Sequence, residues 1–180
     1  MALPLTVILL AGGASRRMGR DKALLRIRGQ RAVDFLASHY AKLALGGVLV
    51  AAGRRRIPNL VFPQFPDPEG PRGPLAGLEA GLEASRYPWV LLVACDQDLL
   101  PAKLLTLLWR GRRRAKAVRL ASNPMPGLYH RTLLPRIHRL RLQGKGPGAL
   151  PSRMLKGGIP ASWNTPRELS DWLRPPLPLE

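Results

Sequence analysis

A string of glycines and cations follows the first apolar run of the chain. Residues 10–22 read LAGGASRRMGRDK, which places three glycines and four cations within one loop. Glycine lets backbone N–H groups approach phosphate oxygens closely, and Arg and Lys neutralise the charge of those oxygens. Neither the G-x-x-x-x-G-K-S/T spacing nor the G-x-G-x-x-G spacing is present. We therefore predict a phosphate-binding loop of another type, in preference to a simple turn with solvated arginines.

A carboxylate follows a second apolar run. The continuous run Trp89–Cys95 is typical of a central parallel strand buried on both faces, and Asp96 comes directly after it. Open parallel sheets bind ligands at this end of their strands. Because Mg²⁺ is held by one or two carboxylates together with phosphate oxygens, Asp96 is a candidate Mg²⁺ ligand. The alternative is that Asp96 caps the next helix, a role for which Asp98 is better placed.

A third candidate, Asp67, lies in a loop rich in proline. The segment Pro63–Pro74 contains five prolines and two glycines, which excludes a helix or a central strand. A loop stiffened by proline can hold a base or a ribose edge with little loss of entropy. The alternative for Asp67 is an ordinary turn residue.

The elements that must position these residues alternate between strands and helices. Strands are predicted at Thr6–Ala11, Val48–Ala52, Leu60–Phe62, Trp89–Cys95 and Ala117–Ala121. Helices are predicted at Val33–Leu45, Leu75–Ser85 and Pro101–Arg110, and from a capping box at Thr165–Glu168 to about Leu173. The alternation indicates an α/β fold, Rossmann-like and three-layered, with a mostly parallel central sheet and helices on both faces.

Two finer expectations concern the helices and the ends of the chain. In Leu75–Ser85, Leu75, Leu78 and Leu82 share one face, and we expect Glu79 and Glu83 to face water. We read residues 1–180 as a single domain with a frayed tail from Pro175.

Composition limits the class of protein. The net charge of +18, from 29 Lys and Arg against 11 Asp and Glu, favours anionic partners such as nucleotides or nucleic acid, although a solvated basic surface has the same composition. The single cysteine, Cys95, and the lack of zinc-ligand spacing suggest a reducing compartment such as the cytoplasm. The run Leu3–Leu10 fits a buried first strand better than a signal peptide, and no apolar stretch reaches the roughly 20 residues of a membrane span.

The glycine loop, the proline-rich loop and the Asp96 motif, in this order along the chain, resemble those of the molybdenum cofactor guanylyltransferase family, also called molybdopterin-guanine dinucleotide biosynthesis protein A. The resemblance covers nearly the whole chain. Its most specific part is Leu10-Ala11-Gly12-Gly13-x-Ser15-x-Arg17-Met18-Gly19-x-Asp21-Lys22, because cytidylyl- and sugar-nucleotide relatives have an Ala-Ala-Gly loop there. Further matches are Gly73–Gly77, Cys95-Asp96, Asn123–Tyr129 and Asn164-Thr165-Pro166-x-Glu168-Leu169.

The resemblance implies a reaction and a set of site residues. In the family, GTP is joined to the terminal phosphate of the molybdenum-bearing pterin, molybdopterin, and pyrophosphate is released. By position, Leu10, Ala11 and Gly12 would contact the guanine nucleotide through their backbone, Gly13 would open the phosphate turn, Lys22 would bind the phosphates, Asp67 would contact the nucleoside and Asp96 would hold Mg²⁺. A role of Arg17 at the triphosphate is also implied. The N-terminal half would then bind the nucleotide and the C-terminal half the acceptor.

Three positions depart from the family pattern. Gly53 replaces an Asn that touches the nucleotide, Asp98 replaces a proline, and Ser162 replaces the first Asn of Asn-x-Asn-Thr-Pro. These changes leave open a relative that uses CTP or another small phosphate acceptor. A basic nucleic-acid-binding module is the alternative from another class, and the aromatic content of 6% counts against it.

The remaining basic side chains have less specific interpretations. His39, His130 and His138 are read as packed or surface histidines, with His130 near the acceptor site. The clusters Arg110–Arg119 and Arg136–Arg141 would either receive the anionic pterin or an acidic partner protein, such as a molybdoenzyme or another cofactor-biosynthesis protein, or form solvated helix faces.

Overall fold

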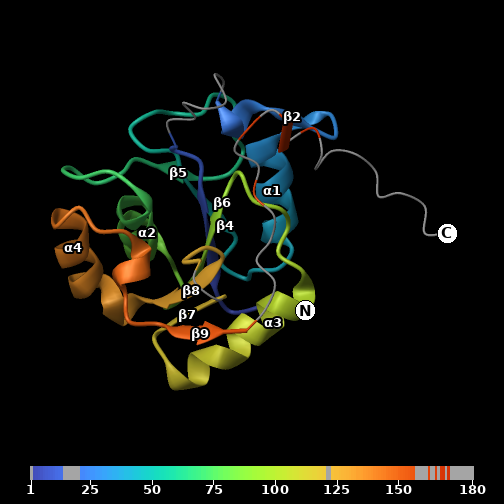
Figure 1. Ribbon diagram of the computed structural model, residues 1–180. Helices are drawn as coiled ribbons and strands as arrows, with labels where there is room; N and C mark the ends of the chain where they lie inside the picture. Colours follow the sequence, from blue (N-terminus) through green and yellow to red (C-terminus); the bar gives the residue numbers. More distant parts are fainter. Residues whose placement is uncertain are drawn as a thin grey trace.

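A seven-stranded sheet organises the chain, with the strands in the order β5-β4-β1-β6-β8-β7-β9 (Figure 1). The structure is a computed structural model that describes residues 2–13, 21–120 and 123–156, together with positions 162, 165, 167, 168 and 170. The strands are β1 (Thr6–Leu10), β4 (Val48–Ala51), β5 (Gln64–Phe65), β6 (Trp89–Ala94), β7 (Ala117–Leu120), β8 (Gly127–His130) and β9 (Arg153–Leu155). A separate two-stranded ribbon consists of β2 (Arg26–Ile27) and β3 (Gln30–Arg31).

The sheet is mostly parallel. Strand β1 pairs in parallel with β4 and with β6, and β4 and β7 pair in parallel with β5 and β9. Strand β8 is antiparallel to both of its neighbours, β6 and β7. The carboxyl ends of β1, β4 and β6 therefore meet at one edge of the sheet, where open α/β sheets bind ligands.

Helices cover both faces of the sheet. They are α1 (Ala32–Ala41), α2 (Pro74–Ala84), α3 (Ala102–Gly111) and α4 (Leu134–Leu142), with 3-10 turns η2 (Lys22–Leu24), η3 (Arg112–Arg114), η4 (Arg131–Leu133) and η5 (Pro147–Ala149). Helices α2 and α4 lie together on one side and α1 and α3 on the other (Figure 1). The predicted three-layer α/β fold is confirmed.

The core follows the alternation of side chains along the central strands. On β1, Val7 and Leu9 pack in the same cluster as Leu36 of α1 and Leu105 of α3. Ile8, between them, packs in the opposite cluster with Leu78 of α2. A strand that is buried on both faces is apolar at nearly every position, which explains the apolar run at the start of the chain, and the one polar side chain of β1, that of Thr6, accepts a hydrogen bond from Ser85.

The predicted strand Leu60–Phe62 is wrong. The side chain of Arg31 donates hydrogen bonds to the carbonyls of Pro58 and Asn59, and Asn59 has a φ of 52°, so this segment turns instead of extending. Strand β5 follows this turn and lies at the edge of the sheet, with a neighbouring strand on one side only. The flanking prolines, which have no N–H, therefore leave no hydrogen bond to a second strand unmade. Helix α1 also ends at Ala41 instead of Leu45, since the following turn pairs with the backbone of Leu3.

Several elements have weak signals in the sequence. Strands β8 and β9 have only four and three residues, and β8 follows two prolines. Helix α4 buries only Ile137 and Leu140 among its apolar residues, so its amphipathic pattern is short. Glu79, which we expected to face water, is buried at 5% exposure, whereas Glu83 is exposed as predicted.

The capping box near the end of the chain is confirmed. The N–H of Thr165 donates to Glu168 Oε2 at 2.8 Å, and the N–H of Glu168 donates to Thr165 Oγ1 at 3.2 Å. The rest of the predicted helix to Leu173, and the tail from Pro175, lie outside the described residues. Over the described part of the chain, no helix has the length and apolar character needed to cross a membrane.

Candidate functional site

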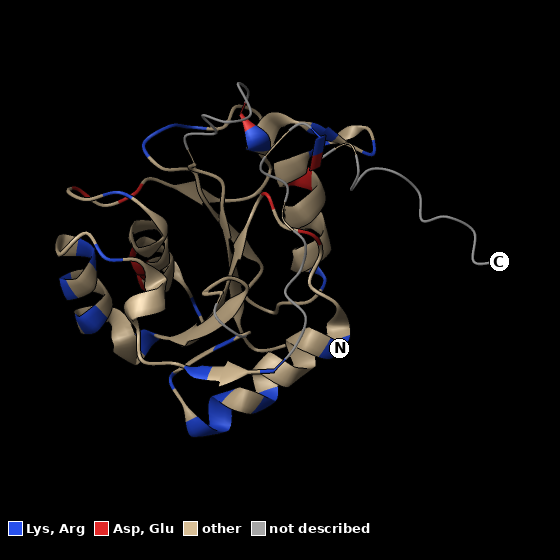
Figure 2. Cartoon of the chain, viewed as in Figure 1, with Lys and Arg blue, Asp and Glu red and all other residues tan. Residues whose placement is uncertain are grey.

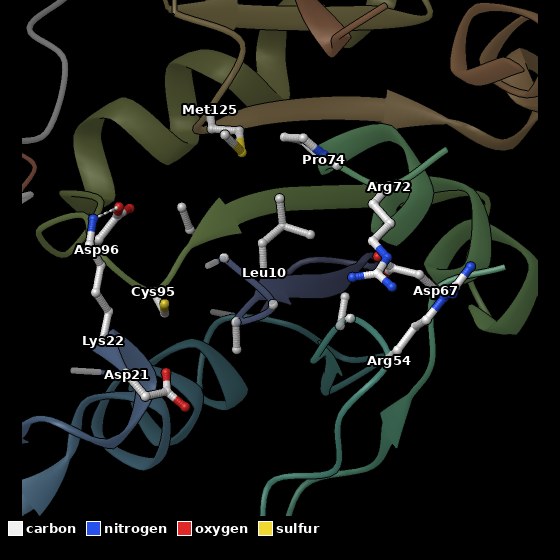
Figure 3. A pocket seen from close by; sticks show the side chains of 17 residues that line it. Leu10, Asp21, Lys22, Arg54, Asp67, Arg72, Pro74, Cys95, Asp96 and Met125 are labelled. Carbon is white, nitrogen blue, oxygen red and sulfur yellow. Dashed lines mark hydrogen bonds and ion pairs between the residues drawn. The ribbon is translucent and has the colours of Figure 1, made fainter. Parts of the chain in front are cut away.

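A pocket of about 300 Å³ opens at the carboxyl ends of β1, β4 and β6 (Figure 3). It gathers every described residue that the sequence predicted to bind the nucleotide or metal. Its lining comprises Leu10, Ala11, Gly12, Gly13, Asp21, Lys22, Ala51, Gly53, Arg54, Asp67, Arg72, Gly73, Pro74, Ala94, Cys95, Asp96 and Met125. Arg17, which the sequence also placed in this set, lies outside the described residues.

The glycine loop starts in close contact with the neighbouring strand. The N–H of Ala11 donates to the carbonyl of Ala51 at 2.8 Å, and the N–H of Cys95 donates to the carbonyl of Leu10 at 3.0 Å. A Cβ on Gly12 would lie 2.6 Å from the backbone nitrogen of Gly53. Only glycine fits at this position, whereas a Cβ on Gly13 would meet open space.

Lys22 and Asp96 form an ion pair across the pocket wall. Asp21 caps η2, because its Oδ1 accepts the N–H of Ala23 at 3.0 Å, and this short turn directs Lys22 toward the sheet. Lys22 Nζ lies 2.8 Å from Asp96 Oδ2, and their side chains are 13% and 25% exposed (Figure 3). A cation and a carboxylate separated by 74 positions in sequence therefore share one point of the pocket.

Arg55 joins the two ends of the glycine loop, and the sequence did not single it out. Its guanidinium donates to the carbonyl of Ala11 and to Asp21 Oδ1, the second at 2.8 Å, and it also pairs with Asp21 Oδ2. Ala11 and Asp21 flank residues 12–20. The geometry assigns Arg55 the role of a clamp at the base of this loop, although its neighbour Arg54 is the residue that lines the pocket.

Asp67 faces two arginines on the other side of the pocket from Asp96 (Figure 3). Its N–H donates to the carbonyl of Gly53 at 3.0 Å, which fixes the proline-rich loop to the end of β4. Burial raises the pKa of the Asp67 carboxyl, and the charges of Arg72, Arg141 and Arg54 oppose that rise. This part of the pocket therefore offers one acidic side chain and two cations to a ligand.

Met125 lines the pocket, and Gln97, which follows Asp96 in the chain, holds the segment around Met125 in place. Gln97 is 6% exposed, and its Nε2 donates to the carbonyl of Met125 at 2.9 Å. Asn123 Oδ1 accepts the N–H of Met125 at 3.0 Å. Ser162, one of the three departures from the family pattern, pairs with Gln97 in an isolated antiparallel bridge. The sequence identified the Asn123–Tyr129 motif but not the buried amide that holds it against the Asp96 turn.

Cys95 lines the pocket as a neutral thiol. Burial, with a smaller contribution from the charge of Asp96, raises its pKa to about 12. The thiolate is the reactive form of cysteine, so this side chain does not serve as a nucleophile near neutral pH.

The structure also places three other sets of polar residues. His130 pairs with Trp89 at the start of β6, the end opposite Asp96, so it lies away from this pocket, and its place near the acceptor site stays a prediction. Neither Asp96 nor Asp98 caps α3, whose N-cap is Pro101, and Asp98 Oδ1 instead accepts the N–H of Leu99 at 2.7 Å. Arg141 is buried at 4% exposure, so Arg136–Arg141 is not entirely a solvated helix face.

Sequence comparison identifies related proteins. The MobA-like NTP transferase domain matches residues 7–157. A protein of Deinococcus radiodurans, named a probable molybdenum cofactor guanylyltransferase, is 34% identical over 149 residues, which cover 79% of this chain and 76% of that protein. A protein of Trichormus variabilis with the same name is 41% identical over 103 residues, or 56% of this chain and 50% of that protein. The chain thus spans about half the length of the second relative.

Solved structures share the fold at lower identity. Molybdopterin-guanine dinucleotide biosynthesis protein A from Archaeoglobus fulgidus superposes with a TM-score of 0.76 at 17% identity, over 93% of this chain and 96% of that one. The 2-C-methyl-D-erythritol 4-phosphate cytidylyltransferase of Thermus thermophilus superposes with a TM-score of 0.70 at 18% identity, over the same shares of the two chains. Both likenesses concern the fold.

The family match covers most of the chain, including the strands and loops that form the pocket. Together with the Deinococcus relative, it confirms the resemblance found in the sequence. The chain belongs to the MobA-like NTP transferase family, among the molybdenum cofactor guanylyltransferases.

Proposed function

We propose that the pocket binds GTP and transfers its guanylyl group to the terminal phosphate of molybdenum-molybdopterin, with release of pyrophosphate. The observation that carries this proposal is the convergence of Gly12, Lys22, Asp67 and Asp96 on one pocket. The names of the sequence relatives support guanine as the base and the pterin as the acceptor. The family match by itself supports nucleotidyl transfer by this chain.

The reaction needs charge neutralisation more than proton transfer. A terminal phosphate is already an anionic nucleophile, so the acceptor requires no general base. The obstacle is the approach of one polyanion to the α-phosphorus of another, and fixed cations reduce that repulsion. Lys22 stands beside the glycine loop, where it would bind the triphosphate, and Arg54 and Arg72 face the same space from the Asp67 side.

Asp96 suits a role in binding Mg²⁺. It presents a carboxylate at the pocket end of β6, 2.8 Å from a lysine that would share phosphate oxygens with the ion. Over the described residues, no group of three His, Cys, Asp or Glu side chains gathers as a ready metal cage. Mg²⁺ commonly binds through one or two carboxylates and completes its shell with phosphates and water, so one aspartate fits. When bound, Mg²⁺ supplies Lewis-acid stabilisation of charge on the phosphates.

The C-terminal half has the charge expected of an acceptor-binding region. No acidic residue occurs between Asp98 and Glu168 in the sequence. Lys and Arg side chains are concentrated on α4 and at the C-terminal end of α3, where it continues into η3 (Figure 2). A uniformly positive region lowers the free energy of a nearby polyanion and raises its local concentration. The same surface would receive an acidic partner protein, and a cytoplasmic setting is consistent with the single buried thiol.

Titration calorimetry of GTP, CTP and ATP with Mg²⁺ tests the proposal, in the wild type and in Lys22→Ala and Asp96→Ala. We expect the wild type to prefer GTP and both variants to bind it more weakly. Turnover with molybdenum-molybdopterin should fall by on the order of 10²–10³ in either variant, as for other preorganised charge-stabilising groups. Full activity in either variant, or equal binding of the three nucleotides, would refute the assignment.

A further inference from the structure

A buried ion pair lies behind the pocket, between α2 and α4. The Nε of Arg141 donates to Glu79 Oε2, and the two side chains are 4% and 6% exposed. His138 closes the outer side, with its Nδ1 2.8 Å from Glu79 Oε1. The loss of hydration that two charges suffer on burial can exceed their mutual attraction, and an apolar pair of similar size is often as stable. The pair therefore calls for a role beyond packing.

The other end of Arg141 holds the proline-rich loop. Its terminal nitrogen Nη1 donates to the carbonyl of Glu69 at 2.8 Å and more weakly to that of Pro71 at 3.4 Å. The loop passes close to this guanidinium, because a Cβ on Gly70 would lie 3.3 Å from the same nitrogen. Residues 66–73 carry Asp67 and Arg72 into the pocket and follow the two-residue edge strand β5.

This loop has few other attachments. Pro66, Pro68 and Pro71 have no N–H to donate. The N–H of Asp67, bonded to the carbonyl of Gly53, ties its first part to β4. Arg141 ties its middle part to α4, so the first and middle parts of the pocket-lining segment are held from different layers of the fold. The charge of Arg141 also acts on the Asp67 carboxyl, whose pKa it lowers against the effect of burial.

We infer that Arg141, oriented by Glu79, is a positioning residue that fixes residues 66–73 and thereby sets the affinity for the nucleoside part of the substrate. The nucleoside ligand in this inference rests on the proposed function, whereas the fixing of residues 66–73 by Arg141 does not. Glu79 satisfies one edge of the guanidinium and turns the other edge toward the loop carbonyls. The planar, multidentate geometry of arginine suits this double task, which a lysine ammonium cannot match.

The test uses variants that separate positioning from folding. Arg141→Met combined with Glu79→Leu removes both charges and leaves neither partner buried alone. Arg141→Lys keeps a cation beside Glu79 but provides only one compact donor group. Arg139→Met is the control, because it removes an exposed cation from the same helix. Thermal unfolding of each variant establishes that the protein under test is folded.

The variants are compared by the hydrogen exchange of the loop and by their affinity for two ligands. Amide hydrogen exchange of residues 66–73 should accelerate by roughly tenfold or more in the double variant and in Arg141→Lys, since loop opening no longer breaks two hydrogen bonds. The Kd for GTP with Mg²⁺ should rise by about tenfold in both, whereas the Kd for inorganic triphosphate, which binds to the glycine loop and Lys22 and meets residues 66–73 only through Arg72, should rise by no more than about threefold. Arg139→Met should change neither quantity.

The possible failures are distinguishable. Unchanged exchange in folded variants would refute the positioning role, whatever the ligand is. Equal weakening of GTP and triphosphate binding would also refute it, because the effect would then be general rather than confined to the nucleoside side. A wild type that does not prefer GTP would overturn the proposed function instead, and the exchange measurement would still decide whether Arg141 holds the loop.

Discussion

Replacing Arg55 by methionine should weaken nucleotide binding while the fold survives. The change removes the guanidinium that joins the carbonyl of Ala11 to the carboxylate of Asp21. Without it, the two residues that flank the glycine loop are no longer linked by a side chain. Nucleotide binding must then also fix the two residues that flank the loop, so the cost appears in the affinity for phosphates.

The magnitude follows from the two contacts and their exposure. Hydrogen bonds to charged groups contribute about 1.5–3 kcal/mol each when buried. The side chains of Arg55 and Asp21 are 36% and 19% exposed, so solvent screening reduces each contact to about 1 kcal/mol. Two contacts give about 2 kcal/mol, which corresponds to a rise of roughly 30-fold in the Kd for GTP.

Titration of GTP and of inorganic triphosphate provides the assay. Both ligands should lose affinity in Arg55→Met, because the loop serves the phosphates. Arg55→Lys should be intermediate, since one ammonium cannot reach both acceptors. Arg56→Met, which removes the next and exposed arginine, is the charge-matched control. If Arg55→Met binds both ligands within about twofold of Arg56→Met, the clamp has no role in binding and the reasoning fails.

Four further results are expected, three of them from substitutions. Gly12→Ala should lower GTP affinity by more than tenfold in calorimetry, because the new Cβ would lie 2.6 Å from backbone. Gly53→Asn should fold with a slightly lower melting temperature, since Asn adopts a φ of 72° at less cost than other residues with a side chain and its Cβ would meet ordinary contacts, and it should strengthen GTP binding. Cys95 should resist alkylation at pH 8 in the folded protein, because burial raises its pKa to about 12. Burial alone would raise the pKa of Glu79, but Arg141 and His138 hold it below 4.5, so its stabilisation is complete above pH 4.5 and is lost as the pH falls through the folded-state pKa. Urea unfolding should accordingly show a difference between wild type and Glu79→Gln that shrinks below pH 4.5.

Part of the site could be predicted because its signals are local. The glycine loop follows β1 and Asp96 follows β6, and a parallel sheet brings those two ends to one edge regardless of the details of packing. The prediction for the edge strand β5, which pairs with β4, was wrong because apolar residues alone do not distinguish an edge strand from a turn. What decided its position was the side chain of Arg31 binding the carbonyls of Pro58 and Asn59, a contact across 27 and 28 positions.

Arg55 had no comparable signal, because it stands in a run of three arginines and a solvated arginine has the same sequence context as one that binds a carbonyl 44 positions away. Gln97 likewise follows Asp96 as an ordinary polar residue, and only the return of the Met125 segment gives its amide a partner. In both cases the information lies in tertiary contacts between loops. Local periodicity and capping rules do not extend to such contacts.

The pair formed by Glu79 and Arg141 is different, because helical periodicity contained a signal for it. Leu75, Leu78 and Leu82 define the buried stripe of α2, and Glu79 lies at the i+4 position of the same stripe. On α4, Arg141 lies four positions after Ile137 and next to Leu140 on the buried side. An acid on one buried stripe and a base on another must pair or be neutralised, since an unpaired buried charge is strongly destabilising. The two helices therefore had to pack with these positions facing each other, and the spare donors of the arginine were left for the loop between β5 and α2.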